Sequence, residues 1–392
     1  MRRIRAGVIG CGSVSIIGIL PQLDEPDARE RLELVAVCDV VEARAQEVAR
    51  RYRVPHVYTD AAELIARDDI DLVLVITPIP LHYRYTMQAL AAGKHVYVQK
   101  TMATTYAEAR EMVGAARHRG LTLVAAPGQM LAPSMQNMRR LVQEGALGKV
   151  YWAWGNTGGW GHDFEWTRHG DDPLTTVDPT WYYKAGGGPQ VDVTVYVLHS
   201  LTGILGPARQ VTAMSGTAVG ERHWRDKRIS MEVDDNTLLL LDFGGATFGF
   251  AGGHSSMTGR LIEWGGMGIY GAEGVIETLE VEPLSGHPSR LFLRSRRPLP
   301  ELAEATDGEW VPPGDLPYVT PAHAVIPEPH VYSDIMHCVE CIVEDRPPIA
   351  SGEHAAHVIE IIEKGYIAAR TGVTQTLEST FEAHPRPTKE RN

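Results

Sequence analysis

The chain has 392 residues, of which 44% are hydrophobic and 22% are charged, and its formal net charge is −12. This composition is typical of a folded globular protein, and the length predicts two domains rather than one. The negative charge and the lack of a basic stripe argue against nucleic acid as a partner, and no apolar run is long enough to span a membrane.

The four cysteines are too few and too scattered for a disulfide framework, which favours a reducing cytoplasm. Cys338 and Cys341 have CxxC spacing, but they lie in an apolar helical run without a second ligand pair. We therefore expect core packing and predict no metal site. The basic and then apolar N-terminus superficially resembles a secretory signal, but glycines interrupt it, and a folded strand, turn and helix explain it better.

The N-terminal residues are predicted to form a strand, a tight turn and a helix. An apolar run over residues 4–9 leads into Gly10-Cys11-Gly12-Ser13-Val14-Ser15. In a dinucleotide-binding unit the first glycine permits the turn, and the second lets the backbone approach the pyrophosphate. We therefore expect Gly10, Gly12, Ser13 and Val14 to bind a dinucleotide. The alternative is a glycine turn in some other α/β unit.

Asp39 follows a continuous apolar run over residues 32–38, which is typical of a strand buried on both faces of a parallel sheet. A carboxylate at this position can accept both ribose hydroxyls, and it would repel a 2′-phosphate. Val40 and Val41 provide no cation for that phosphate. NAD is therefore favoured over NADP, and the alternative is that Asp39 is a simple turn residue.

Helical and strand patterns alternate up to residue 126, which predicts a doubly wound parallel sheet in a Rossmann domain over residues 1–127. The helices are expected at 42–52, 61–67, 81–92 and 104–119, and the further strands at 70–76, 95–98 and 121–126. Ligands bind beyond the carboxyl ends of such strands.

Two of these strand ends carry candidate binding residues. Thr77, Pro78 and His82 follow one strand, and Gln99 and Lys100 follow the next. We expect them to line the cofactor cleft, and Lys100 could also hydrogen-bond a substrate oxygen. For His82, packing at the start of a helix is an equal alternative.

After a linking helix at 133–144 the period changes to that of short strands. They are expected at 150–154, 210–215, 236–243, 247–252, 261–264, 267–270 and 275–278. This pattern predicts an α+β domain over residues 128–392 with a large, mostly antiparallel open sheet, followed by apolar helices at 331–344 and 353–371.

The stretch 184–206 is interpreted as a mostly apolar helix opened by three glycines and Pro189. Asp192, Tyr196 and His199 fall on one face of it at about 100° per residue. Ionisable groups on a largely buried helix need partners or a cavity, so these three are candidate catalytic residues.

The segment 160–181 is unusually rich in Trp, His, Asp and Arg for a loop. Flat aromatic rings beside polar groups suit a sugar-like ligand, and anchoring of the loop by tryptophan packing is an equal alternative. The candidate substrate contacts are Trp160, His162, Arg168, Trp181 and, before a late helix, His330.

With these pieces placed, the sequence resembles the Gfo/Idh/MocA oxidoreductases, the family that includes inositol dehydrogenase. The resemblance is carried by Gly10-Cys11-Gly12, Val37-Cys38-Asp39, Thr77-Pro78 with His82, Gly93-Lys94-His95-Val96 with Lys100, 141–148, Gly186-Gly187-Gly188 with Asp192, Gly271-Ala272-Glu273-Gly274, and Arg346-Pro347-Pro348 with Ser351-Gly352-Glu353. It implies NAD(P)-dependent chemistry on sugars or cyclitols, and a C-terminal sheet that forms homo-oligomer contacts, as a dimer or tetramer.

Two positions depart from the family pattern. Gln99-Lys100-Thr101 replaces Glu-Lys-Pro, so the loop lacks the proline that tolerates a cis bond. Tyr196 stands where the family usually has histidine.

Hydride transfer between a carbinol carbon and the nicotinamide needs a positioned base. We expect Tyr196 with Lys100 in that role, because an adjacent ammonium favours a phenolate. Asp192 would hold a substrate hydroxyl or orient Lys100, and His199 is the alternative acid/base. Two other functions remain open: a redox-neutral NAD enzyme that cleaves glycosides, and a sugar sensor that binds the dinucleotide without chemistry.

Overall fold

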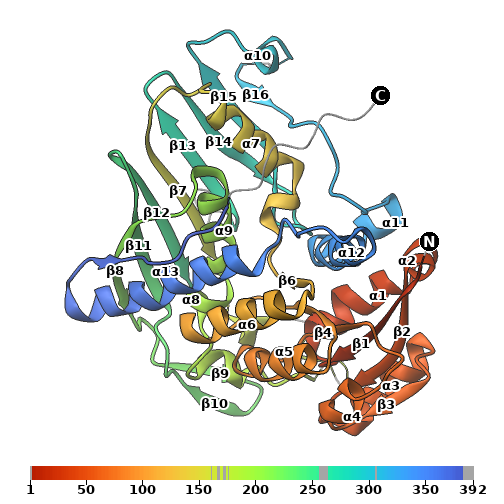
Figure 1. Ribbon diagram of the computed structural model, residues 1–392. Helices are drawn as coiled ribbons and strands as arrows, with labels where there is room; N and C mark the ends of the chain where they lie inside the picture. The colour runs from red at the N-terminus through yellow and green to blue at the C-terminus, as the bar shows by residue number, and fades with distance from the viewer. Residues whose placement is uncertain are drawn as a thin grey trace.

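In the computed structural model the described residues are 2–159, 161–165, 168–170, 174, 176–255, 264–304 and 307–382. They form a six-stranded parallel sheet, a nine-stranded mixed sheet and a two-stranded hairpin, with helices packed around the sheets (Figure 1). The parallel sheet lies in the N-terminal part of the chain and the larger sheet follows it. This is the α/β architecture that the sequence pattern predicts.

The parallel sheet has the strand order β3-β2-β1-β4-β5-β6. Its strands are β1 (Ile4–Ile9), β2 (Leu32–Cys38), β3 (His56–Tyr58), β4 (Leu72–Val75), β5 (His95–Val98) and β6 (Leu123–Ala125). The helices are α1 (Leu20–Leu23), which continues a π-helical turn at Ser15–Ile19, α2 (Pro26–Arg31), α3 (Glu42–Tyr52), α4 (Ala61–Ile65), α5 (His82–Ala91) and α6 (Tyr106–Arg119). The sequence missed α2, which is short and mostly charged, and β3, which has only three residues.

The nine-stranded sheet has the order β16-β15-β14-β13-β7-β12-β11-β8-β17, and β7 with β12 is its parallel pair. Its strands are β7 (Val150–Gly158), β8 (Gln210–Gly216), β11 (Asn236–Gly244), β12 (Thr247–His254), β13 (Gly266–Gly271), β14 (Gly274–Val281), β15 (Pro288–Ser295), β16 (Glu309–Trp310) and β17 (Gln375–Thr376). The strand expected at 261–264 falls mainly on 261–263, which lie outside the described residues. The hairpin β9 (Glu221–Trp224) and β10 (Lys227–Ser230) was not predicted, nor was β15.

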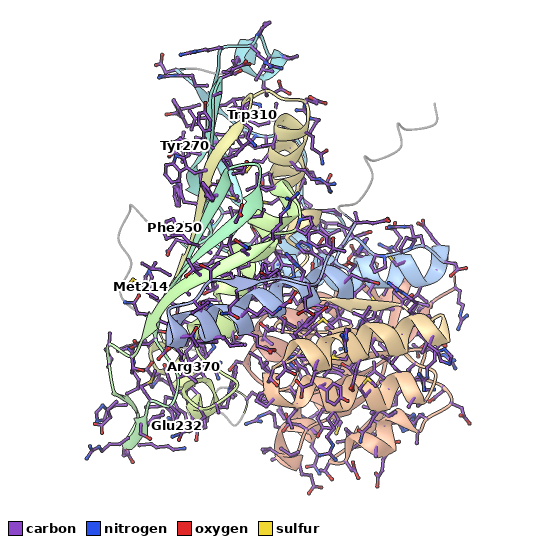
Figure 2. All side chains as sticks on the ribbon, turned by 60° about the vertical axis from the view of Figure 1, so that its left-hand side comes forward. Met214, Glu232, Phe250, Tyr270, Trp310 and Arg370 are labelled. Carbon is purple, nitrogen blue, oxygen red and sulfur yellow. The ribbon has the colours of Figure 1, made fainter. Side chains whose placement is uncertain are left out.

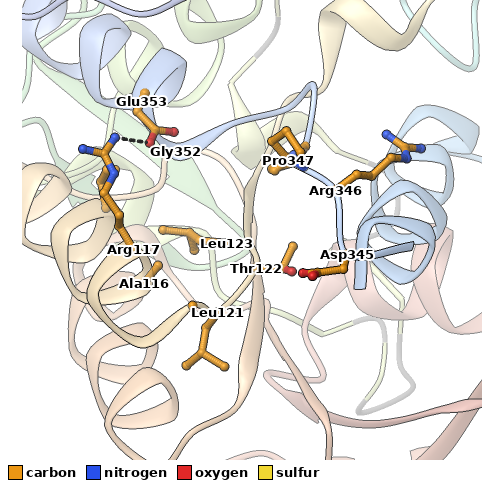
Figure 3. Close-up of a pocket in the computed structure, with 13 residues that line it drawn as sticks. Ala116, Arg117, Leu121, Thr122, Leu123, Asp345, Arg346, Pro347, Gly352 and Glu353 are labelled. Carbon is orange, nitrogen blue, oxygen red and sulfur yellow. Dashed lines mark hydrogen bonds and ion pairs between the residues drawn. The ribbon is translucent and has the colours of Figure 1, made fainter. Parts of the chain in front are cut away.

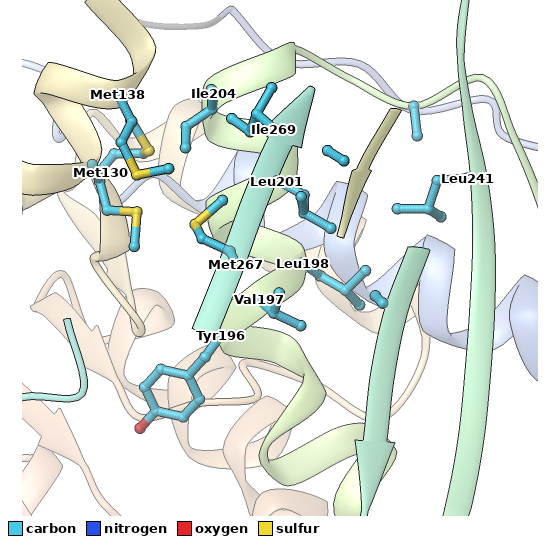
Figure 4. Packing of buried hydrophobic residues seen from close by; sticks show 14 of the residues in the cluster. Met130, Met138, Tyr196, Val197, Leu198, Leu201, Ile204, Leu241, Met267 and Ile269 are labelled. Carbon is cyan, nitrogen blue, oxygen red and sulfur yellow. The ribbon is translucent and has the colours of Figure 1, made fainter. Parts of the chain in front are cut away.

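One face of the large sheet packs against α9 (Thr194–Leu205), and Figure 4 shows the apolar side chains between them. Two strand glycines let the helix approach closely. A Cβ on Gly155 would lie 1.8 Å from Val197, and one on Gly253 would lie 1.6 Å from the Thr194 hydroxyl. The helix expected over 184–206 is in fact broken at Val193, which separates the short α8 (Pro189–Asp192) from α9.

The last two long helices return to the parallel sheet. Residues of α12 (Pro329–Glu344) join the apolar core beside β1 and β2, while α13 (Gly352–Thr371) packs against both α6 and β8. The division of the chain at residue 127 stays a prediction. The remaining helices are α7 (Pro133–Gln143), α10 (Pro300–Glu304) and α11 (Pro321–Ala324), with short turns at Ile79–Leu81, Gln129–Leu131, His162–Phe164 and Thr180–Tyr183. Among the described residues, no helix is long and apolar enough to cross a membrane.

Candidate active site

The turn after β1 depends on glycine. Gly10 adopts a φ of +101°, and a Cβ there would lie 2.3 Å from the carbonyl oxygen of Ile76. A Cβ on Gly12 would meet no atom within 4 Å, so the backbone is open at that point. Ser15, at the position of the third glycine of the motif, donates its hydroxyl to the Gly10 carbonyl at 2.6 Å. The turn is therefore closed at its base and open at Gly12.

Asp39 is fixed against this turn. Its carboxylate accepts hydrogen bonds from the backbone N–H groups of Cys11 and Val41, each at 2.9 Å. Arg44, on the first turn of α3, lies 3.3 Å from the same carboxylate. Val40 and Val41 provide no cation, as expected from their side chains, but Arg44, five positions after Asp39, does.

Two hydroxyl oxygens beside this turn, Ser13 Oγ and Thr77 Oγ1, are buried and have no hydrogen-bond partner in the described structure. Buried hydroxyls are normally paired, and a phosphate or ribose oxygen would supply the partner. With the open backbone at Gly12 and the carboxylate of Asp39, these groups fit a bound dinucleotide. Val14 packs against the core behind the turn, and Pro78 leads into the turn Ile79–Leu81.

Two further residues predicted to line the cofactor cleft hold loops together. The ring of His82 is fully buried, with Nδ1 2.7 Å from the carbonyl oxygen of Thr101 and Nε2 2.7 Å from that of Thr77. Burial lowers the pKa of His82. Gln99 Oε1 accepts the backbone N–H of Lys100 at 2.7 Å. His82 thus connects the turns after β4 and β5, and Gln99 fixes the backbone of Lys100.

Side chains from the turn after β5 hydrogen-bond the backbone at the helix break at Val193. Lys100 Nζ lies 2.7 Å from Asp192 Oδ1 and donates to the Asp192 carbonyl at 2.8 Å. The Thr101 hydroxyl donates to the carbonyl of Val191. Carbonyls at a helix end lack helical donors, so these two contacts satisfy them. The peptide bond between Lys100 and Thr101 is cis.

Asp192 belongs to a chain of alternating charges. Its Oδ2 lies 3.3 Å from His162 Nε2, while His162 Nδ1 pairs with Glu165, and Glu165 pairs with Arg168. Burial works against the charge on Asp192, but Lys100 and His162 outweigh it and hold its pKa well below the usual range. Burial also opposes the charge on His162, whose pKa Glu165 and Asp192 nevertheless raise. For Glu165, His162 and Arg168 overcome burial and lower the pKa to about 2.

Tyr196 lies one turn after Asp192, and its hydroxyl points away from the apolar cluster that holds its ring (Figure 4). The ring centroid is 4.7 Å from that of Trp264 and 5.4 Å from Lys100 Nζ, and the hydroxyl is 3.4 Å from His330 Nε2. Burial raises the pKa of Tyr196 well above its usual value, and nearby carboxylates add to this. The expectation that Lys100 favours a phenolate is not met, because its ammonium is paired with Asp192 and faces the ring.

His330 stands on the first turn of α12 and connects Tyr196 to Glu328. Its Nε2 lies 3.4 Å from Glu328 Oε2, the same distance as from the Tyr196 hydroxyl. Burial lowers the pKa of His330 well below its usual value, so the ring is neutral. The site thus has a second carboxylate beside the one that binds Lys100.

His199 does not join this group. Its Nδ1 donates to the carbonyl of Val195 at 2.8 Å, its ring lies 4.7 Å from that of His354 in a tilted arrangement, and burial lowers its pKa to about 4. The ring of Trp181 is 5.9 Å from that of His162, at the edge of the charged chain. Trp160 lies outside the described residues.

Sequence reasoning missed Glu165 and Glu328. Glu165 follows His162 by three residues, and that spacing is a signal for a pair on one helical turn. Nothing in the local pattern marks Glu328, which lies in the loop before α12 and reaches the site through the packing of α12 on the first helix.

Two surface grooves lie elsewhere. One lies between α6 and the turn that joins α12 to α13, where Arg117 pairs with Glu353 (Figure 3). The other lies between α7, the end of α9 and the β11–β12 turn. Neither is lined by Lys100, Asp192 or Tyr196.

Comparison with known proteins agrees with this architecture. Residues 4–126 match the model of the oxidoreductase family with an NAD-binding Rossmann fold, and residues 135–277 match the GFO/IDH/MocA C-terminal domain. The chain therefore belongs to the Gfo/Idh/MocA oxidoreductase family, and its N-terminal part is an NAD-binding Rossmann domain.

Relatives in this family are named as dehydrogenases of diols and sugars. Trans-1,2-dihydrobenzene-1,2-diol dehydrogenase of Oryctolagus cuniculus is 28% identical over 71% of this chain and 74% of its own. D-glucoside 3-dehydrogenase of Escherichia coli (strain K12) is 31% identical over 55% of this chain and 59% of its own. The WlbA dehydrogenase of Bordetella pertussis, solved with NADH and UDP-GlcNAcA, superposes with a TM-score of 0.75 at 20% identity, covering 96% of this chain and 98% of that one.

Proposed function

We propose that the protein is an NAD-dependent dehydrogenase that oxidises an alcohol carbon of a sugar, a glycoside or a cyclitol. The observation that carries this proposal is the meeting of Lys100, Asp192 and Tyr196 beyond the carboxyl end of β5, where such sheets bind ligands. The names of the diol, glucoside and xylose dehydrogenases among its relatives support the reaction class.

Residues of the chain itself remove the proton of the substrate hydroxyl and pass it on. NAD, when bound, accepts the hydride. Lys100, oriented by Asp192, places a positive charge where the substrate oxygen becomes negative. Tyr196 is a neutral phenol and acts by exchange: it takes the hydroxyl proton while passing its own to His330. Ser13, Thr77 and Asp39 are the proposed cofactor contacts.

The aromatic ring that can face a sugar-like ligand beside the polar groups of the site is the partly exposed Trp181, which the buried Tyr182 supports. The ring of Tyr182 lies 4.2 Å from that of His162, and Trp181 stands edge-on to Tyr182 at 6.0 Å. These rings adjoin the charged chain that begins at Asp192. Flat apolar surfaces beside fixed polar groups are what a hydroxylated ring needs.

A screen of sugars, glycosides and inositols by NADH absorbance tests the proposal. For the best substrate, Tyr196→Phe should lower kcat by about 10²-fold or more, since it removes the exchangeable proton. Tyr52→Phe is the control, because Tyr52, at the end of α3, is also a buried tyrosine, and its hydroxyl has no hydrogen-bond partner among the described residues. Near-normal turnover of Tyr196→Phe would remove Tyr196 from this role. Accumulation of NADH also separates net oxidation from redox-neutral chemistry.

We further propose that the outer face of the large sheet joins two copies of the chain. Figure 2 shows Met214, Phe250 and Tyr270 along this face. Trp152 stacks on Tyr270 at 4.4 Å and is paired in register with Phe248, while Met214 is 80% exposed. Contiguous exposed apolar surface of this kind is typical of an interface. Sedimentation velocity should give a dimer or tetramer, and a monomer at all concentrations would exclude this.

A cytoplasmic location is also proposed. All four cysteines are free and buried, which suits a reducing compartment. Fractionation of the source cells with an antibody to the protein would place it directly, and recovery outside the cytoplasm would contradict the proposal.

A further inference from the structure

We propose that His330 and Glu328 form the path by which the proton of the substrate hydroxyl, once exchanged through Tyr196, reaches solvent. This inference rests on the proposed dehydrogenase function, in which His330 takes the proton of Tyr196, and adds Glu328 as the group that passes it on to solvent. Neither His330 nor Glu328 had a role in proton transfer in the reasoning from sequence.

The geometry is that of a short relay with one open end. His330 Nε2 lies 3.4 Å from the Tyr196 hydroxyl and 3.4 Å from Glu328 Oε2. Tyr196 is 6% exposed and His330 is 5% exposed, so the phenol has little direct access to water. The side chain of Glu328 is 38% exposed. A proton that leaves Tyr196 therefore has an exit through His330 to a carboxylate that solvent can reach.

The fold holds Glu328 in a conformation that its sequence does not favour. Its φ is +63°, in the left-handed region, which costs a residue with a side chain about 1 kcal/mol or more. Gly18, on the first helix, makes room for it, since a Cβ there would lie 2.5 Å from the Cβ of Glu328. Gln22, one turn further, donates to the carbonyls of His323 and Ile326 and fixes the loop. The helix that follows the nucleotide-binding turn therefore positions this carboxylate.

The protonation states suit a relay. Neighbouring protein atoms displace much of the water around the Glu328 carboxyl and raise its pKa to about 7, although 38% of the side chain still reaches solvent; Glu165 and Asp192 add to the rise and Lys100 opposes it. Glu328 can therefore gain and release a proton near neutral pH. Because burial keeps His330 neutral, its ring passes a proton on rather than retaining it. The groups that face Glu328 are thus one cation, two carboxylates and a neutral imidazole.

Each bond in the transfer balances. The substrate O–H bond breaks and its proton bonds to the oxygen of Tyr196. The phenol's own proton moves to His330 Nε2, and from there to Glu328 Oε2, which releases it to water. The electron pair of the broken C–H bond leaves with the hydride, for which NAD is the acceptor.

The test compares Glu328→Gln with wild type and with Glu344→Gln, which changes an exposed carboxylate at the far end of α12, the helix that Glu328 precedes. In wild type, kcat for alcohol oxidation should rise with pH through an apparent pKa near 7 and then level off. In Glu328→Gln, kcat should fall at least about tenfold and lose this inflection, with KM little changed. Added acetate should restore part of the rate of Glu328→Ala, because a small carboxylate can occupy the vacated space. His330→Gln, which retains a hydrogen-bonding group but does not pass a proton, should match Glu328→Gln.

A second readout needs neither cofactor nor substrate. Because the pKa of Glu328 is raised in the folded protein, the stability that its neutral form contributes is present at low pH and is lost as pH rises through about 7. The free energy of urea unfolding of Glu328→Gln, relative to that of wild type, should therefore increase as pH rises through about 7. The same difference for Glu344→Gln should not change with pH.

The possible failures are distinct. Wild-type protein that oxidises no alcohol with NAD defeats the proposed function itself. Wild-type protein that turns over, with Glu328→Gln showing the same kcat and the same pH profile, overturns the relay alone. Loss of rate without any pH-linked change in stability, and without rescue by acetate, would make Glu328 merely structural and would also overturn it.

Discussion

Two buried aspartates, Asp39 and Asp192, mark the two halves of the site, and they are held in different ways. Asp39 accepts two backbone N–H groups, from Cys11 and from its own turn at Val41. Asp192 is held by side chains, Lys100 and His162, that come from two other loops. A carboxylate bound by backbone is fixed by the fold. One bound by ionisable side chains depends on their protonation and can take part in moving protons.

Because of this difference, we expect the removal of a charge beside Asp192 to lower turnover more than a change at Asp39 does. Lys100→Met should lower kcat by about 10² to 10⁴-fold, because it removes the cation that stabilises the forming alkoxide. Steady-state kinetics at saturating NAD measures this.

Lys364→Met is the matched control. Lys364 Nζ lies 2.7 Å from Glu360, and the exposures of the two side chains, 19% and 1%, are close to the 18% and 5% of Lys100 and Asp192. Both variants break an ion pair with a buried carboxylate, but only one pair lies in the site. Equal turnover in the two would show that the Lys100 pair is merely structural.

At Asp39 we expect a change of cofactor preference rather than loss of chemistry. Asp39→Ala removes the charge that repels a 2′-phosphate and releases Arg44 to bind one. The ratio of affinities for NADH and NADPH, measured by fluorescence titration, should shift toward NADPH by about 10- to 100-fold, or roughly 1.4 to 2.7 kcal/mol.

A second substitution assigns the cause. Asp39→Ala combined with Arg44→Ala should weaken the binding of NADH without increasing the affinity for NADPH. Asp60→Ala, which removes the N-cap of α4 in the same domain, should leave the preference unchanged. An unchanged preference in Asp39→Ala itself would mean that Asp39 does not face the ribose.

The same contrast explains what the sequence could predict. The parallel sheet and the turn at Gly10 were predictable because apolar runs and glycines act locally. The break at Val193 was not, because the run 191–198 reads as continuous helix and the break depends on donors from Lys100 and Thr101. The β9–β10 hairpin was missed because its strands are short and polar.

In the candidate site too, residues marked by a local pattern were predictable and those placed by distant contacts were not. Residues at strand ends were found from the fold rule alone, and the structure gathers Lys100, Asp192 and Tyr196 at one place. Their roles stay predictions. His199 lies three residues after Tyr196 on α9, but its ring packs near His354 of α13 instead of joining the site. Glu328 depends on contacts with Gly18, more than 300 positions away, and no local pattern shows such a contact.

The smallest expected effect concerns His162 and its dependence on pH. The pKa of His162 is raised in the folded protein, because Glu165 and Asp192 outweigh its burial. A raised pKa means that the stability from protonated His162 is complete below its unfolded value of about 6.5 and is lost as pH rises through the folded value. The free energy of urea unfolding of His162→Asn should therefore fall below that of wild type by about 1 kcal/mol at mildly acid pH, and the difference should be smallest at alkaline pH.

His118→Asn, a change at an exposed position of α6, provides the comparison and should show no such trend. A constant difference between His162→Asn and wild type across pH would mean that His162 is held as a neutral ring. The chain of alternating charges would then end at Asp192, whose carboxylate would depend on Lys100 alone. Asp192 and Asp39 would then be held in more similar ways, because each would have a single cationic partner.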